Sequence, residues 1–359
     1  MTSVEDRPGR PARHHDPVAY GLLIVMAVMF AGTWVAAHWA TEEIPPLTVA
    51  FLRFLVASVL LWAWARLTGV PIRVGRADLP LVVAMGVSGI FLYNVCFLYG
   101  VRLAPSSDGA VIVPGLSPVA VAALVAVRYG IRPPGRAMAG LGMALVGLVV
   151  VIGPAMTSSP ARAVGDLLFV AGAVCWGVYS VLSRAATVRF HPVAVTLAAA
   201  AFGAVAFAPF AVLERGWEPV LDASPRALAS VVYLGALGTV IAFVAFAEGI
   251  RRIGAPRASA FIVLVPLLGE VLTFWLLGED VGGLIVGGTA LVLAGLWLVQ
   301  TARPAVRRPE AAGLTGAATS EPSDGLSGTP DQPPEPSATL DEPPEPPAHL
   351  PGPPGGSET

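Results

Sequence analysis

The sequence contains no lysine: all 22 basic residues among its 359 are arginine. A P-loop and a lysine Schiff-base enzyme both need a lysine, so both are excluded. Only two cysteines occur, Cys96 and Cys175, and both lie within apolar segments, which makes a disulfide framework or a cysteine metal site implausible. The formal net charge of −2 gives no reason to expect a nucleic-acid partner.

Charged residues of either sign are scarce as well. They make up 13% of the chain, whereas a soluble domain carries about 25%. The remaining composition is 55% apolar and is arranged in runs close to the length that crosses a bilayer. Ten such runs are expected, at 18–40, 46–66, 79–102, 107–128, 136–153, 165–183, 192–213, 227–249, 256–277 and 283–300.

The two ends of the chain differ from the apolar part. Residues 1–17 form a polar leader with three arginines, and the run after it is about twice as long as the apolar part of a signal peptide, so we expect an uncleaved first span. Residues 301–359 hold 14 prolines and nine acidic residues, which predicts a disordered tail with polyproline II character. A bland tail is favoured over one that recruits a proline-recognising partner.

The arginines also predict an orientation. With the N-terminus placed in the cytoplasm, 17 arginines fall in cytoplasmic segments and four in outer loops, and Arg53 lies inside a span. Arginine-rich loops stay in the cytoplasm. We therefore expect an even number of spans, with both termini cytoplasmic.

The apolar part repeats itself at an offset of 148 residues. Pro118, Gly130, Gly140 and Gly147 correspond to Pro266, Gly278, Gly288 and Gly295, and nearby pairs have offsets of 146 and 149. Each repeat holds five runs, an odd number, so the second would be inserted upside down. We expect an all-α integral membrane protein of ten transmembrane helices in two inverted five-helix repeats, 18–153 and 165–300, as in secondary transporters.

Several of these residues carry a resemblance to a known family. The Arg53-Phe54 pair after Pro46, the Gly278-Glu279 pair after Pro266 and the Trp176-Gly177 pair resemble motifs of the ten-span EamA-domain members of the drug/metabolite transporter superfamily. The first repeat departs from the pattern, with Gly130-Ile131 in place of Gly-Glu and Phe30-Ala31 in place of Trp-Gly. The resemblance implies a carrier of small metabolites in a plasma membrane of the bacterial inner-membrane type, and it leaves the substrate unspecified.

Ionisable residues within spans are functional candidates because they are costly to insert. Glu270 could exchange a proton or bind a substrate amine, or it could be permanently paired. Arg53 could hold a substrate carboxylate, although a structural role is favoured, and pairing of Arg53 with Glu270 is a hypothesis. Glu248, beside Arg251 and Arg252, is expected to be a solvated helix end.

Polar and aromatic residues complete the expected pathway. The substrate or proton pathway candidates are Glu270, Arg53, Asn94, Trp34, Tyr93, Tyr179 and Ser180, although for each aromatic residue a packing role is the commoner alternative. Pro114, Pro118 and Pro266 are candidates for helix breaks or hinges. Gly283 and Gly287 could form a homodimer face or pack internally, and packing is favoured.

We therefore predict a secondary-active transporter, an exporter of amino acids or drug-like compounds that works by alternating access and is coupled to protons or another gradient. The expected partners are membrane lipid and the small-molecule substrate. The sequence shows no catalytic or metal-binding constellation, so neither an enzyme nor a cofactor is expected. Two alternatives are a membrane-embedded enzyme acting on lipid-linked substrates and a membrane-anchored interaction protein.

Overall fold

A computed structural model describes residues 16–72, 75–130, 133–187, 189–279 and 282–302 of the chain. Its regular structure over these residues is entirely helical. The long helices are α1 (Pro17–Glu43), α2 (Pro46–Thr68), α5 (Ser106–Tyr129), α6 (Gly135–Ser158), α7 (Pro160–Thr187), α8 (Pro192–Leu213) and α14 (Gly283–Thr301). The all-α prediction is therefore confirmed for this part of the chain.

Three of the expected runs are helices assembled from several segments. The third run comprises the 3₁₀ turn η1 (Arg76–Asp78), α3 (Leu79–Met85), the π-helix η2 (Gly86–Leu92) and α4 (Tyr93–Leu103). The eighth comprises α10 (Pro225–Val232), the π-helix η3 (Tyr233–Ile241) and α11 (Ala242–Ile253), after the short α9 (Trp217–Asp222). The ninth comprises α12 (Ala255–Ala260), the 3₁₀ turn η4 (Phe261–Val263) and α13 (Leu264–Leu277).

Nine helices in the described ranges are long and apolar enough to cross a membrane. The ninth expected run is the exception, because its apolar helix is the shorter segment Phe261–Leu277. Pro266 lies just after the η4 turn and has no N–H to donate to the carbonyl of Ile262. The 3₁₀ turn thus comes one turn before Pro266, and α13 runs through the proline.

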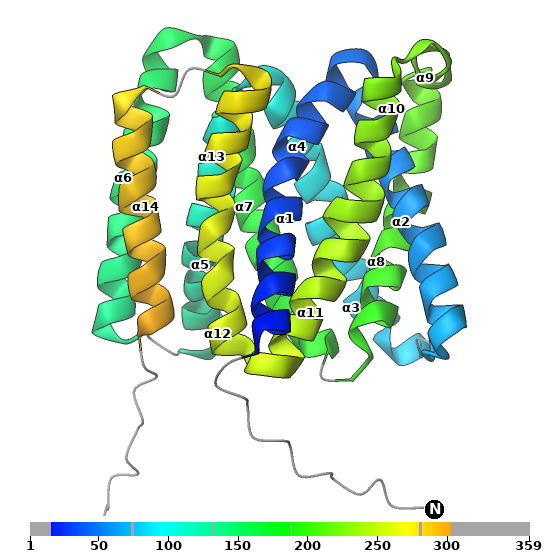
Figure 1. Cartoon of the computed structure of the whole chain (residues 1–359), viewed down its shortest axis with the longest axis horizontal. Helices are drawn as coiled ribbons and strands as arrows, with labels where there is room; N and C mark the ends of the chain where they lie inside the picture. The colour runs from blue at the N-terminus through cyan, green and yellow to red at the C-terminus, as the bar shows by residue number, and fades with distance from the viewer. Residues whose placement is uncertain (1–15, 73–74, 131–132, 188, 280–281, 303–359) are drawn as a thin grey trace, which may run out of the picture. The chain divides into compact units, whose positions relative to one another are not determined.

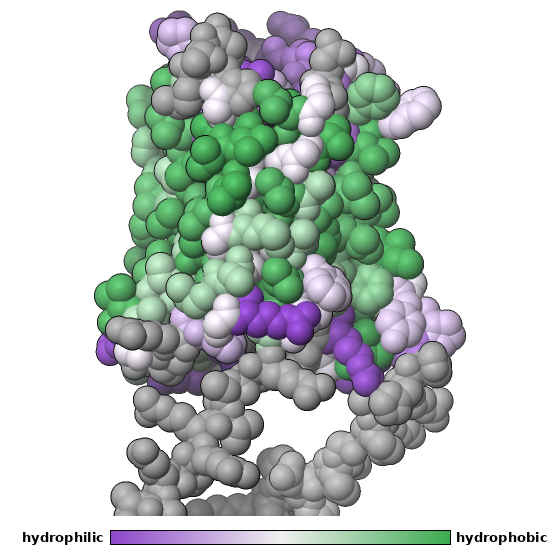
Figure 2. Space-filling model, turned by 90° about the vertical axis from the view of Figure 1, so that its left-hand side faces the viewer, coloured by the Kyte–Doolittle hydropathy of each residue, from purple (hydrophilic) through white to green (hydrophobic). Residues whose placement is uncertain are grey.

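The surface of the described helices is apolar. Large side chains such as Trp275 and Val149 are 77% and 70% exposed. Figure 2 shows the face on the side of α6 and α14, where apolar side chains form a broad band and polar residues gather at the two ends. A surface of this kind is stable in hydrocarbon and aggregates in water, so the helices form a multi-pass membrane protein.

The two π-helices have matching surroundings. η2 packs on α7 and α8, whereas η3 packs on α1 and α2. Glycines permit the close approach: a Cβ on Gly89 would lie 2.2 Å from the Tyr179 ring, and one on Gly238 would lie 2.5 Å from the Thr33 methyl. Both π segments therefore contact interior side chains of helices that are remote in the sequence.

α6 and α14 pack tightly through glycines. A Cβ on Gly140 would lie 2.6 Å from the carbonyl oxygen of Gly295, and one on Gly147 would lie 2.6 Å from that of Gly288. The positions of Gly283 and Gly287, by contrast, face open space. The favoured internal packing role of that pair is therefore wrong, because α14 turns its other glycines toward α6.

α1 begins and α14 ends at the same end of the helix bundle (Figure 1). The start of α1 is held there by Asp16, which accepts hydrogen bonds of 3.1 Å from the N–H groups of Val18 and Ala19. The bond from Ala19 lowers the pKa of Asp16. The leader before Asp16 and the tail after Ala302 lie outside the described residues.

Glu248 belongs to an ion-pair cluster at this end of the bundle. Its carboxylate accepts a hydrogen bond of 2.6 Å from Nε of Arg252, and Arg252 also contacts Asp16. Glu248 is partly exposed near the end of α11, in agreement with the expectation of a solvated helix end. Through Arg252 and Asp16, the cluster joins α11 to the start of α1.

Candidate functional site

A buried polar network joins three helices in the interior. Nη1 of Arg53 on α2 donates to Oδ1 of Asn94 on α4 at 3.1 Å, and Nε donates to the hydroxyl of Thr239 on η3 at 3.3 Å. Asn94 donates in turn to the carbonyl of Ile90, and Thr239 donates to that of Leu234. Arg53 is 9% exposed and Asn94 is 1% exposed. Two predicted pathway residues thus meet, together with Thr239, which the sequence analysis missed.

Arg53 lies in this network without an acidic partner. Within the described ranges, its hydrogen bonds go to neutral acceptors and it forms no ion pair. A buried guanidinium without a carboxylate is unusual, because desolvating the charge costs several kcal/mol unless an anion compensates it. The site is therefore electrostatically suited to an anionic ligand.

The hypothesis that Arg53 pairs with Glu270 is wrong. Glu270 on α13 is 8% exposed and accepts a hydrogen bond of 3.1 Å from the hydroxyl of Thr289 on α14. It lines a groove of about 320 Å³ between these two helices, whose other walls are almost entirely apolar. Helical geometry places Glu270 on the α14 side of α13, which could not be deduced from its sequence position alone.

A continuous row of aromatic rings passes through the interior. Trp34 packs edge-to-face on Phe97 and Phe169, at centroid distances of 4.9 and 5.6 Å. Tyr93 stacks on Phe97 and lies 5.0 Å from Trp176, which lies 5.1 Å from Tyr179. The predicted residues Trp34, Tyr93 and Tyr179 all belong to this row, which joins α1, α4 and α7.

The row ends at a cavity. Tyr179 lines a space of about 340 Å³ bounded by α2, α7, α8 and α11. The remaining lining mixes aromatic and aliphatic side chains with two hydroxyls: Leu61, Ser183, Pro192, Val193, Val195, Thr196, Phe243, Val244, Phe246, Ala247 and Ile250. Leu61 lies about two helical turns after Arg53 on α2, so the cavity and the polar network share that helix.

Other predicted residues have local roles. Ser180 donates to the carbonyl of Trp176, one turn back in α7, at 2.7 Å. Pro114 and Pro118 lie inside α5, which remains α-helical through both. The hydroxyl of Ser117 bonds back to Val113, in the turn that the prolines deprive of N–H groups.

Carboxylates at one end of the bundle cap helices that lack caps of their own. α2 and α5 both begin after a proline whose side chain cannot accept a hydrogen bond. Glu214 accepts from the N–H of Thr48 at 2.9 Å, and Glu279 accepts from those of Ser106 and Ser107 at 2.8 and 2.9 Å. Each carboxylate satisfies free N–H groups and the positive end of a helix dipole.

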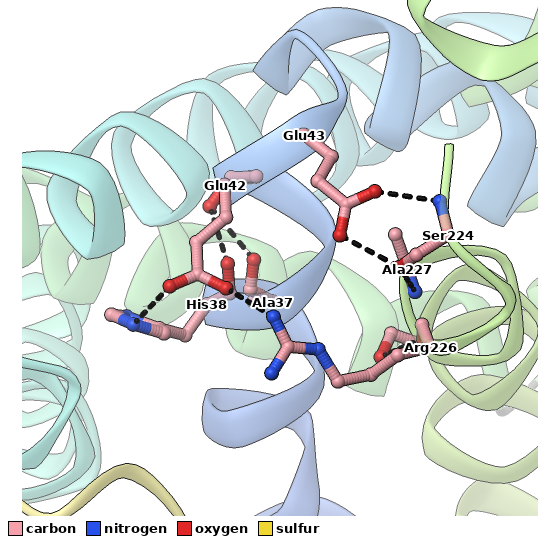
Figure 3. Close-up of polar contacts among 9 residues, drawn as sticks. Ala37, His38, Glu42, Glu43, Ser224, Arg226 and Ala227 are labelled. Carbon is pink, nitrogen blue, oxygen red and sulfur yellow. Dashed lines mark hydrogen bonds and ion pairs between the residues drawn. The ribbon is translucent and has the colours of Figure 1, made fainter. Parts of the chain in front are cut away.

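A third carboxylate supports the start of α10 indirectly, because it binds Ser224, whose hydroxyl caps α10 by accepting from the N–H of Ala227. Figure 3 shows Glu43, at the end of α1, accepting hydrogen bonds from the N–H and hydroxyl of Ser224, while the neighbouring Glu42 meets His38 and Arg226. The contact of Glu279 with the start of α5 gives a structural role to both residues of the Gly278-Glu279 pair. Gly278 ends α13 with a φ of 67°, and Glu279 then accepts from the N–H of Ser106 at the start of α5.

Buried acids near the start of α5 were not singled out from the sequence. Asp108 and Asp166 are both fully buried, and Arg162 binds Asp108 through two hydrogen bonds of 2.9 and 3.1 Å. Each aspartate is the second residue of an expected apolar run, and a charge at the start of a run is commonly solvated. The sequence feature that could have indicated their burial is that both lie inside the bounds of a run.

The comparisons with known proteins agree with this architecture. The model of the EamA-like transporter family matches residues 18–153 and 163–301. An uncharacterized transporter of Archaeoglobus fulgidus is 26% identical over 77% of this chain and 95% of its own. A crystal structure at 24% identity superposes with a TM-score of 0.58, over 80% of this chain and 98% of its own, which shows the fold alone.

Two relatives carry names that state a substrate. A probable terminal-alkyne amino-acid exporter of Streptantibioticus cattleyicolor is 29% identical over 80% of this chain and 95% of its own. The aromatic amino acid exporter YddG of Ancylobacter novellus is 30% identical over 63% of this chain and 77% of its own. Since the family model covers most of the chain and the described helices form an apolar bundle, this protein belongs to the EamA-like transporter family of multi-pass membrane proteins.

Proposed function

We propose that this protein is a secondary-active exporter of amino acids or similar small amphipathic compounds, and that Arg53 binds the substrate carboxylate. The observation that carries the proposal is the buried guanidinium of Arg53, held by Asn94 and Thr239 without an acidic partner. Arg presents a planar fork that suits a carboxylate. An anion there would compensate the buried charge.

The aromatic row supports the remainder of the substrate class. Tyr93 directly precedes Asn94 in α4, and its ring leads through Trp176 to Tyr179 at the cavity. Aromatic faces stabilise apolar and planar groups. The printed names of the two amino-acid exporters among the relatives agree with a substrate that has both a carboxylate and an apolar side chain.

Alternating access between ten spans in two inverted repeats is part of the proposal. The contact pairs Gly140–Gly295 and Gly147–Gly288 exchange with each other when the offset of 148 is applied, as an internal two-fold axis requires. The packing of η2 on α7 and α8, and of η3 on α1 and α2, obeys the same exchange. Inverted repeats of this kind allow one half to rock against the other around a fixed site.

The tenth span would be the helix that ends at Leu277. Together with α12 and η4 it extends from Ala255, and the shared end of the start of α1 and the end of α14 supports an even number of crossings (Figure 1). The arginine distribution supports placing that end in the cytoplasm. A plasma membrane of the bacterial type is the membrane that family membership implies.

Proton coupling would reside at Glu270. This carboxyl is the one ionisable group among the residues that line the α13–α14 groove, and Thr289 is its hydrogen-bond donor. A carboxyl in apolar surroundings can exchange protons near neutral pH. Glu270 lies on α13, whereas the Arg53 network lies on α2, α4 and η3. Coupling between the two sites would therefore act through the movement of α13.

The decisive experiment is counterflow of labelled amino acids in liposomes that contain the full chain. We expect uptake of apolar or aromatic amino acids by the wild type and its loss in Arg53→Gln, with Arg66→Gln, at the end of α2, as the matched control. Uptake by Arg53→Gln at the wild-type rate would refute the carboxylate role of Arg53. A lack of uptake of every amino acid by the wild type would refute the substrate class.

A further inference from the structure

Three acidic residues lie near the start of α5: Asp108, Asp166 and Glu279. The one basic side chain that the described contacts place among them is Arg162, which can compensate a single negative charge. Arg162 on α7 donates hydrogen bonds from Nε and Nη2 to the carboxylate of Asp108 on α5. The carboxylate of Glu279 accepts hydrogen bonds from the N–H groups of Ser106 and Ser107. Arg162 therefore compensates Asp108, and the α5 N-terminus compensates Glu279. One acid of the cluster, Asp166, remains.

Asp166 has no donor of its own. It lies one turn after Arg162 on α7 and is 0% exposed, and neither of its carboxylate oxygens has a hydrogen-bond partner in the described part of the chain. The hydroxyl of Ser106, at the start of α5, is equally buried and also lacks a partner. An ionised carboxylate without partners in this position would be strongly destabilising.

The group that Asp166 faces is the carboxyl of Asp108: Arg162, one turn before Asp166 on α7, binds Asp108, and both aspartates are buried where α5 packs on α7. Two carboxylates in contact cannot both be ionised, whereas a single shared proton satisfies both as donor and acceptor. One proton on the pair also balances the cluster: a single negative charge remains beside Arg162. Among the described residues, two further acids are near enough for their charge to influence this pair: Glu279, and Glu270 on α13.

We infer that Asp108 and Asp166 form a proton-binding carboxyl pair that holds α5 against α7. A metal ion does not fit as well, because among the described residues no group of three or more His, Cys, Asp or Glu side chains is placed to hold one. α7 approaches closely here: a Cβ on Gly165, the residue before Asp166, would lie 2.6 Å from the side chain of Ala104. Loss of the proton places two negative charges in contact and drives α5 and α7 apart at this end.

The pair lies on α5 and α7, whereas Glu270, the proposed proton site, lies on α13, and the pair does not depend on the identity of the substrate. The test is therefore spectroscopic and uses the purified full chain carrying Glu270→Gln, which removes the other candidate. We expect difference infrared spectra to show the C=O stretching band of a protonated carboxyl at neutral pH, lost on titration to alkaline pH. Adding Asp166→Asn should remove this band, and adding Glu279→Gln should leave it.

A second measurement covers the case in which a variant folds poorly. Asn at position 166 can donate an N–H to Asp108 as the protonated acid does, so the Tm of Asp166→Asn should be independent of pH where that of the wild type falls with alkalinity. A band that persists unchanged in Asp166→Asn would overturn the inference. Loss of the band when sodium is added at constant pH would also overturn it, in favour of a cation site.

Discussion

The hydroxyl of Thr289 on α14 donates a 3.1 Å hydrogen bond to the carboxylate of Glu270 on α13. These two helices otherwise touch little, and a groove separates their apolar faces. The bond links α13, which begins directly after the η4 turn, to α14, which packs on α6 through glycines. A change at Glu270 therefore alters both the charge in the groove and the attachment of α13.

Glu270→Gln should abolish proton coupling while transport persists. Gln retains an acceptor for Thr289 but cannot release a proton, so substrate counterflow should continue without a pH change in the liposome lumen. Thr289→Val keeps the carboxyl and should keep the pH change. A substrate-dependent pH change of wild-type size in Glu270→Gln would exclude this carboxyl as the coupling group.

Asn94→Asp should supply Arg53 with an internal counterion. The substitution is isosteric, and it replaces the neutral Oδ1 that lies 3.1 Å from Nη1 of Arg53 with a carboxylate oxygen. A substrate carboxylate would then compete with a permanent partner, so transport of carboxylate substrates should fall at least about tenfold, equivalent to about 1.4 kcal/mol. The Tm in detergent should not fall.

Asn94→Asp should lower the transport rate without lowering the Tm, provided that Arg53 binds the substrate carboxylate. If Arg53 has only a structural role, the new ion pair leaves the transport rate unchanged. That outcome, measured as initial rates of counterflow with matched protein content, would contradict the proposed carboxylate site.

Gly140→Ala should destabilise the α6–α14 pair. Its Cβ would lie 2.6 Å from the carbonyl oxygen of Gly295, and backbone cannot move aside cheaply. We expect a loss of about 1–3 kcal/mol, as for overpacking. Gly142→Ala, in the same helix but facing open space, is the control and should be neutral or stabilising by about 0.5–1 kcal/mol. Equal Tm values for the two variants would argue against this packing.

Glu279→Ala should weaken the start of α5, because the N–H groups of Ser106 and Ser107 lose their acceptor. The expected loss is about 1 kcal/mol, the size of a helix cap. Glu279→Gln retains one acceptor oxygen and should lose less, and Glu218→Ala, at an exposed position, should lose nothing measurable. Thermal unfolding in detergent ranks the three, and an unchanged Tm in Glu279→Ala would show that the cap is dispensable.

A chain that ends at Ala302 should transport at the wild-type rate. Every contact described for the site comes from residues 16–302, and the tail beyond is polar and rich in proline. Counterflow of the shortened chain tests the alternative of a membrane-anchored interaction protein, which would require the tail. Loss of transport together with normal folding would favour that alternative.

The sequence by itself determined the elements of this protein. Apolar runs near 20 residues can only be helices in a bilayer, because a helix satisfies its own backbone groups, and the bounds of nearly every run agree with a helix in the structure. Asn94 was named from the sequence as a pathway candidate, and its buried amide has two hydrogen-bond partners. The family was also readable, since its motifs are local in the chain.

Only the tertiary structure decided which residues meet. Helix rotation is not fixed by a segment that is apolar all round, so the sequence could not tell that Glu270 faces Thr289 rather than Arg53, or that α14 presents Gly288 and Gly295 rather than Gly283 and Gly287 to α6. The contact of Asp108 with Asp166 has the same origin. These acids lie on different helices, and only the packing of α5 against α7 brings their carboxyl groups together.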